Sequence, residues 1–128
     1  MNTLAGRASY GATTGAIRIN GARDTVRNYS AFVGFVPQDD IMLPELTVYE
    51  TLHFYARMRL PRTMAARKQH ALIADVIESL GLAHVAHAPI GDAAVRGISG
   101  GQRKRVNVGM ELVSRPSLLF LDEVRHDD

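Results

Sequence analysis

Cysteine is absent from this 128-residue chain. Its absence excludes disulfide bonds and thiolate metal sites, and it fits a reducing compartment. Long apolar runs are absent too, since stretches such as "LLFL" fall far below the roughly 18 residues that a membrane-spanning helix needs. The first residues, "MNTLAGRASYG", lack the apolar core of a signal peptide. We therefore expect this stretch by itself to be soluble and to insert no segment into a membrane.

A strong excess of one charge is also absent, because 15 Lys and Arg are nearly balanced by 13 Asp and Glu. The basic residues are scattered, and Arg103–Arg105 form the one tight run. No nucleic-acid recognition pattern accompanies that run, so we interpret it as facing solvent or an anionic ligand, and we expect no nucleic-acid partner. An apolar content of 46% fits one modest folded domain.

The first third of the chain predicts short strands. Residues 2–7 resemble the end of a helix that stops at Gly6. Residues 16–20 alternate like a strand and are followed by Asn20-Gly21, a strong turn signal. A second strand is predicted over 29–38, ended by Pro37, which cannot donate to a sheet ladder.

From Thr47 the apolar period becomes helical. The pattern predicts one helix over 47–60, with Thr47 as its N-cap, and a second over 64–82, with Gly81 as its C-cap. The apolar face of the second helix consists of Leu72, Ile73, Val76, Ile77 and Leu80. A loop over 83–98 follows.

The last third predicts a helix after Ser99, which Pro116 and Ser117 interrupt before the run 118–121. This continuous apolar run is typical of a strand buried on both faces. Strands, helices and a final buried strand together predict an α/β fold with a helical insertion.

Ser99 and Gln102 have the spacing of a capping box at the start of that helix. Between them stand Gly100 and Gly101, although glycine destabilises a helix by roughly 1 kcal/mol relative to alanine. Bare N–H groups at a positive helix end can approach a phosphate closely, so we favour phosphate binding over capping alone.

Polar side chains end both longer predicted strands. Asp122 and Glu123 follow 118–121, at the edge where α/β proteins place ligands, and Gln38 ends the strand 29–38. One carboxylate can hold Mg²⁺ while its neighbour polarises a water. Alone, such acids are more often a solvated strand end and Gln38 a loop residue. The glycine-rich helix start twenty residues upstream favours the functional interpretation.

Taken in order, "GFVPQDD", "LPELTVYETLHFYARMRLP" and "VRGISGGQRKRVNVGMELVSRPSLLFLDE" resemble the nucleotide-binding domain of an ABC transporter. The wording is most similar to the G subfamily of half-transporters, and the resemblance covers residues 1–123. It implies a P-loop NTPase-type sheet with a helical subdomain over about 45–95, whose surface receives the coupling helix of a membrane domain. The residues 1–128 would then be a partial domain of this kind.

The resemblance also assigns roles to single residues. Ser99 to Gln102 would be the signature motif, which contacts the γ-phosphate of ATP held by a second nucleotide-binding domain in a homo- or heterodimer. Asp122 would bind Mg²⁺ and Glu123 would be the catalytic base. Gln38 would be the Q-loop glutamine, which contacts the metal or the attacking water. As part of a transporter, the two nucleotide-binding domains would lie on the cytoplasmic face of a membrane.

Three parts of the family pattern are missing from the sequence. The segment Gly6 to Thr13 has the glycine spacing of a P-loop, but Ala12 stands where the lysine belongs. The chain resembles a stretch that begins a few residues after the P-loop. Residues 124–128 do not match the D-loop, no switch histidine follows, and His126 is no credible substitute. His84 and His87 have a possible metal-ligand spacing without a third ligand, so we expect them to be surface residues.

Three functions remain open at this point. The first is a fragment of the ATP-hydrolysing domain of a transporter that exports a hydrophobic or lipid-like substrate, with no ATPase activity of its own because the P-loop is missing. The second is a non-enzymatic short protein that pairs with an intact nucleotide-binding domain and modulates it. The third is a soluble ABC ATPase of repair or translation. An incomplete sheet would leave exposed edges.

Overall fold

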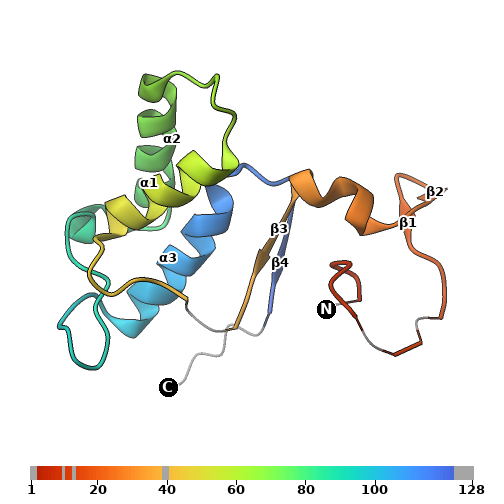
Figure 1. Cartoon of the computed structure of the whole chain (residues 1–128), viewed down its shortest axis with the longest axis horizontal. Helices are drawn as coiled ribbons and strands as arrows, with labels where there is room; N and C mark the ends of the chain where they lie inside the picture. Colours follow the sequence, from red (N-terminus) through yellow and green to blue (C-terminus); the bar gives the residue numbers. More distant parts are fainter. Residues whose placement is uncertain (1–2, 10, 13, 39–40, 123–128) are drawn as a thin grey trace.

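A computed structural model describes residues 3–9, 11–12, 14–38 and 41–122. Figure 1 shows three α-helices gathered at one end, a pair of strands beside them, and a small hairpin with the N-terminal segment at the other end. The helices are α1 (Val48–Arg59), α2 (Ala66–Ser79) and α3 (Gly100–Leu112). The described residues also include two 3₁₀ helices, η1 (Val26–Phe32) and η2 (Ala83–Val85).

Within the described part of the chain, the strands form two separate pairs. β1 (Arg18–Ile19) and β2 (Ala22–Arg23) make an antiparallel hairpin, whose turn residues Asn20 and Gly21 both have positive φ, 52° and 85°. This confirms the predicted turn, because a two-residue hairpin turn of this type needs φ > 0 at both positions. β3 (Val33–Val36) and β4 (Leu118–Leu121) pair in parallel, as an α/β fold requires.

The structure corrects three expectations about these segments. Residues 3–6 form a turn closed by the Gly6 N–H on the Thr3 carbonyl, not the end of a helix, and Asn2 lies outside the described residues. Residues 29–32 belong to η1, so the strand predicted over 29–38 is only four residues long. The side chain of Asp24 explains this, since it accepts hydrogen bonds from the Thr25 N–H, the Asn28 amide and the Tyr29 hydroxyl. These bonds hold the segment in a local turn.

The third correction concerns β4. We expected it to be buried on both faces, but Leu118 is 47% exposed and Leu121 is 40% exposed. Among the described residues β4 has one neighbouring strand, β3, and the apolar run is therefore only partly covered.

Helix boundaries follow the predicted local signals. Thr47 and Glu50 form a capping box at the start of α1, and the backbone N–H bond lowers the pKa of Glu50. At the end of α2, Gly81 has a φ of 64° and donates to the Glu78 carbonyl, while the Leu82 N–H donates to the Ile77 carbonyl. This pair of bonds is a Schellman motif, so the predicted C-cap glycine is confirmed. α2 begins two residues later than predicted.

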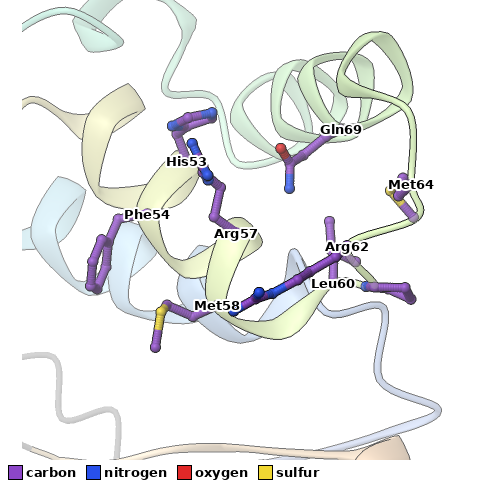
Figure 2. Close-up of a pocket in the computed structure, with 9 residues that line it drawn as sticks. His53, Phe54, Arg57, Met58, Leu60, Arg62, Met64 and Gln69 are labelled. Atoms are coloured by element: carbon purple, nitrogen blue, oxygen red, sulfur yellow. The ribbon is translucent and has the colours of Figure 1, made fainter.

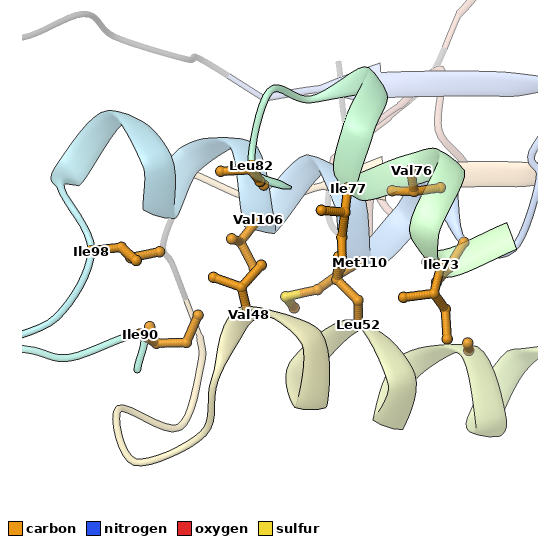
Figure 3. Packing of buried hydrophobic residues seen from close by; sticks show 12 residues of the cluster. Val48, Leu52, Ile73, Val76, Ile77, Leu82, Ile90, Ile98, Val106 and Met110 are labelled. Atoms are coloured by element: carbon orange, nitrogen blue, oxygen red, sulfur yellow. The ribbon is translucent and has the colours of Figure 1, made fainter. Parts of the chain in front are cut away.

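The core lies between the three α-helices and the loop that precedes α3 (Figure 3). Val48 and Leu52 of α1, Ile73 of α2 and Val106 of α3 are completely buried. Of the predicted apolar face of α2, Ile73, Val76 and Ile77 are buried, while Leu72 and Leu80 pack against the core partly exposed. Apolar burial at about 25 cal/mol per Å² is the main force that fixes α3 and its N-terminus relative to the other helices.

Candidate functional site: the start of α3 and the edge of the parallel strands

The N-terminus of α3 carries the predicted capping box. The Ser99 Oγ accepts a hydrogen bond from the Gln102 N–H at 3.2 Å, and the Gln102 Oε1 accepts one from the Ser99 N–H at 2.8 Å. Ser99 itself is exposed and has extended backbone geometry, as an N-cap residue should. The box thus stabilises the helix start through Ser99 and Gln102 alone, and it gives no reason for the two residues between them.

Gly100 and Gly101 occupy those two positions in helical backbone geometry. A Cβ atom built on either glycine meets no atom of the described residues within 4 Å. The neighbouring glycines behave differently: a Cβ on Gly97 would lie 2.3 Å from the Ile90 carbonyl oxygen, and one on Gly91 would lie 2.5 Å from the Gly97 backbone. Packing within the described chain therefore demands Gly91 and Gly97, but it does not demand Gly100 or Gly101.

α3 is tied to the segment that carries Gln38. The Lys104 Nζ donates to the Gln38 carbonyl oxygen at 2.7 Å, and the Asn107 side-chain amide donates to the Pro37 carbonyl oxygen at 3.2 Å. Lys104 and Asn107 stand one turn apart on α3, so they present two donors on the same helix face. The backbone that follows β3 is thereby held to the helix that begins at the glycine pair.

One turn further along α3, Glu111 joins α1 to β3. Its carboxylate accepts hydrogen bonds from both terminal nitrogens of Arg59, at 2.6 and 2.7 Å. Its Oε2 also accepts a hydrogen bond from the Phe35 N–H at 3.3 Å. The Glu111 side chain is 8% exposed and that of Arg59 is 35% exposed. This bidentate pair makes the position of α3 depend on α1 as well as on β3.

Asp122 lies at the carboxyl edge of the strand pair, on the same edge as Gln38. The register pairs Val36 with Leu121, and the Asp122 N–H donates to the Val36 carbonyl oxygen at 3.1 Å, which extends the ladder by one bond. Gln38 is exposed and Asp122 is half-buried. A carboxylate and an amide oxygen are ligand types that Mg²⁺ accepts. Glu123, His126 and the other residues of 124–128 lie outside the described residues.

The structure changes our interpretation of the basic run Arg103–Arg105. Lys104 binds the Gln38 carbonyl, and the Arg105 guanidinium donates to the Leu80 carbonyl at 2.9 Å, at the C-terminal end of α2. Neither side chain simply faces solvent or an anion, because both satisfy backbone carbonyls. Their partners are 66 and 25 residues away in the sequence, and no local pattern signals such contacts.

His84 and His87 are exposed, as expected. Within residues 3–9, 11–12, 14–38 and 41–122, no three His, Asp or Glu side chains converge on a metal position. Sequence reasoning missed one contact of this region, however: the His84 Nε2 lies 3.2 Å from the Nε2 of Gln102.

A separate hollow lies on the surface of α1 and α2, within the predicted helical subdomain (Figure 2). It measures about 730 Å³, and its lining combines apolar side chains, among them Phe54 and Met58, with the guanidinium groups of Arg57 and Arg62. Phe54 is 56% exposed and Met58 is 71% exposed. Exposed apolar side chains of this size on one face are typical of a protein-contact surface.

A parallel strand pair with polar residues at its carboxyl edge, and a glycine-bearing helix start attached to it, are features that α/β nucleotide-binding proteins share. Comparison with known proteins makes this class specific. A family model described as "ABC transporter" matches residues 1–125. The chain belongs to the ABC transporter family.

Its relatives include members of the G group of that family. The chain is 50% identical over 123 residues to ABC transporter G family member 28 of Arabidopsis thaliana and 45% identical over 127 residues to G family member 22 of the same plant. It is 43% identical over 123 residues to the broad substrate specificity ATP-binding cassette transporter ABCG2 of Rattus norvegicus. Each alignment covers 96% of the chain, which spans 11%, 16% and 19% of these relatives, respectively. None of the helices in the described part of the chain has the length and apolar character that a bilayer crossing requires.

Proposed function

We propose that this chain is part of the ATP-hydrolysing domain of a G-type ABC transporter, and that Ser99 to Gln102 close over the γ-phosphate of an ATP molecule held by a second such domain. The observation that carries this proposal is the glycine pair. Gly100 and Gly101 stand in the first turn of α3 with open space in front of them, where an alanine would fit without a clash. Helix stability favours alanine there, so the glycines indicate an external group that approaches the backbone closely.

The chain's own half of the site is the strand edge. Asp122 and Gln38 would hold Mg²⁺, because their oxygen atoms suit this ion and the β3–β4 register brings them to one edge. When bound, Mg²⁺ neutralises charge that develops on the phosphate oxygens. Glu123 follows Asp122 in the sequence and would accept the proton of the attacking water. Gln38 would also orient that water.

The helical region over about 45–95 would be the helical subdomain, and the hollow beside Phe54 and Met58 supports its contact with a membrane domain. This domain would lie on the cytoplasmic face of the membrane, as part of a transporter that exports a hydrophobic or lipid-like substrate. The name of the rat relative states a broad substrate specificity for that protein, which is compatible with this substrate class.

The test is ATP-dependent pairing with an intact nucleotide-binding domain of the same family that contains a P-loop. We expect the chain to associate in ATP and Mg²⁺, and Gly100→Asp to abolish the association, because a carboxylate would repel the γ-phosphate. Ala66→Asp is the matched control, since it places the same charge at the first residue of another helix, α2, in an exposed position. Pairing that survives Gly100→Asp in ATP would contradict the proposed role of the signature motif.

Hydrolysis is tested separately. Because the sequence contains no P-loop lysine, we expect no measurable ATPase activity from this chain alone. Activity of the purified chain that disappears with Glu123→Gln would contradict this expectation. ATP-independent pairing that changes the activity of the intact domain would instead favour the non-enzymatic modulator.

A further inference from the structure

His84 makes a contact that neither the family pattern nor the capping box explains. It stands in η2, between α2 and the loop that leads to α3, and its Nε2 atom faces the side-chain nitrogen of Gln102 at 3.2 Å. Two nitrogen atoms at this distance form a hydrogen bond only if one of them donates and the other accepts. The other hydrogen bond of the Gln102 amide sets which of the two nitrogen atoms donates.

The capping box decides that direction. A backbone N–H can only donate, so the Ser99 N–H requires the oxygen of the Gln102 amide, Oε1, on its side at 2.8 Å. The NH₂ end of the same amide then points at His84 as a donor. Consequently the His84 Nε2 accepts, and the proton of the neutral imidazole resides on Nδ1.

We infer that His84 is a positioning residue for the signature segment: as a neutral Nδ1–H tautomer it fixes the Gln102 amide in the orientation that caps Ser99. An imidazole protonated on Nε2 would meet the amide NH₂ with a second donor, and the amide would lose its partner. With the amide held, the box occupies the N–H groups of Ser99 and Gln102. The intervening N–H groups of Gly100 and Gly101 stay outside the box, at the positive end of α3.

Buried and hydrogen-bonded residues on both sides of His84 fix its position. Leu82 is completely buried, and it both closes the Schellman motif of α2 and accepts the Val85 N–H at 3.0 Å. Arg105 of α3 donates to the Leu80 carbonyl at 2.9 Å, which ties the end of α2 to the helix that Gln102 begins. The ring is thus carried to the start of α3 by packed elements on both sides.

This inference deepens the proposed function, and its consequence for phosphate binding rests on that function. The tautomer itself does not, so it can be tested on the whole chain alone. The experiment records long-range ¹H–¹⁵N correlations of histidine-labelled protein at mildly alkaline pH. We expect the His84 signals of the Nδ1–H tautomer, and we expect Gln102→Ala to abolish this preference by removing the donor. An Nε2–H tautomer in the unmodified chain would overturn the inference.

Amide exchange at Ser99 tests the positioning role in the same samples. His84→Ala is expected to accelerate exchange of the Ser99 N–H about fivefold, the factor that one net hydrogen bond of about 1 kcal/mol represents. His84→Gln should restore protection, because its amide oxygen can accept from Gln102. His84→Lys should not, because an ammonium group only donates. Unchanged exchange in His84→Ala, or equal protection in the Lys and Gln variants, would overturn the positioning role.

Failure of the proposed function has a different signature. If the unmodified chain shows the Nδ1–H tautomer and the exchange pattern above but does not pair with an intact domain in ATP, the inference about His84 stands and the proposed phosphate contact is wrong. If pairing occurs but the tautomer is Nε2–H, the proposed phosphate contact stands and the inference about His84 is wrong.

Discussion

Gly101→Ala separates stability from function at one position. Gly101 is the second residue of α3, and an added Cβ would meet no atom of the described chain within 4 Å. Alanine is more favourable than glycine in a helix by about 1 kcal/mol in the interior, and we expect about 0.5–1 kcal/mol in this first turn. The free energy of unfolding should therefore rise. The methyl group would at the same time fill the space that the proposed phosphate needs.

The methyl group in that space should weaken ATP-dependent pairing. An extra methyl group in a close contact costs about 1–3 kcal/mol, so ATP-dependent pairing with an intact domain should weaken about fivefold or more. Urea unfolding followed by the helical circular dichroism signal measures the first effect, and ATP-dependent co-purification or titration measures the second.

Gly109→Ala is the matched control on the same helix. There an added Cβ would lie 3.0 Å from the side chains of Leu52 and Leu80, so the gain in stability should shrink or reverse while pairing is unaffected. Gly97→Ala, whose Cβ would lie 2.3 Å from the Ile90 carbonyl oxygen, should destabilise. If Gly101→Ala stabilises the chain and leaves pairing intact, the phosphate explanation of the glycine pair is refuted. A destabilised Gly101→Ala would instead show a structural need for this glycine.

Three further outcomes follow from the contacts and burial. Glu111→Gln removes the negative charge from a largely buried ion pair, a change that costs about 3–5 kcal/mol when the pair is fully buried. Because Arg59 is 35% exposed, we expect the free energy of unfolding in urea to fall by about 2–3 kcal/mol. A change below about 0.5 kcal/mol would mean that water screens the pair. Leu52→Ala truncates a completely buried side chain and should lower the free energy of unfolding by about 2–5 kcal/mol in the same assay, whereas a loss below about 1 kcal/mol would contradict the packing described. Hydrogen bonds from backbone N–H groups lower the pKa of Glu50 and of Asp92, so both carboxylates stabilise the fold at a pH above the ordinary carboxyl range. This contribution is lost as the pH falls through that range to the lowered pKa values, so the urea midpoint should fall with the pH. Glu50→Gln should make the urea midpoint less dependent on pH.

Signals confined to one turn of chain could be read from the sequence. The capping boxes at Thr47 and Ser99, the glycine at position 81 and the Asn20-Gly21 turn each depend on residues at most five positions apart, and all four are confirmed. The strand predicted over 29–38 was too long because hydrogen bonds to Asp24, upstream of the apolar pattern, hold its first part in a turn.

In the candidate site, too, local features could be predicted from the sequence and long-range contacts could not. The order of family-like motifs along the chain predicts that Ser99 to Gln102, Gln38 and Asp122 belong to a nucleotide site, and the capping geometry of Ser99 follows from its neighbours. By contrast, the pairs Lys104–Gln38, Arg59–Glu111 and His84–Gln102 join residues 66, 52 and 18 positions apart.

The sequence by itself thus determined the helix caps and the family, and it predicts the phosphate-type motif, because these depend on local backbone chemistry and on order along the chain. Only the tertiary structure decided which side chains hold that motif in place. Burial of the apolar faces of α1, α2 and α3 against one another sets the distance between their polar ends. Whether Glu111 meets Arg59, or Gln102 meets His84, depends on that packing and on no pattern within either segment.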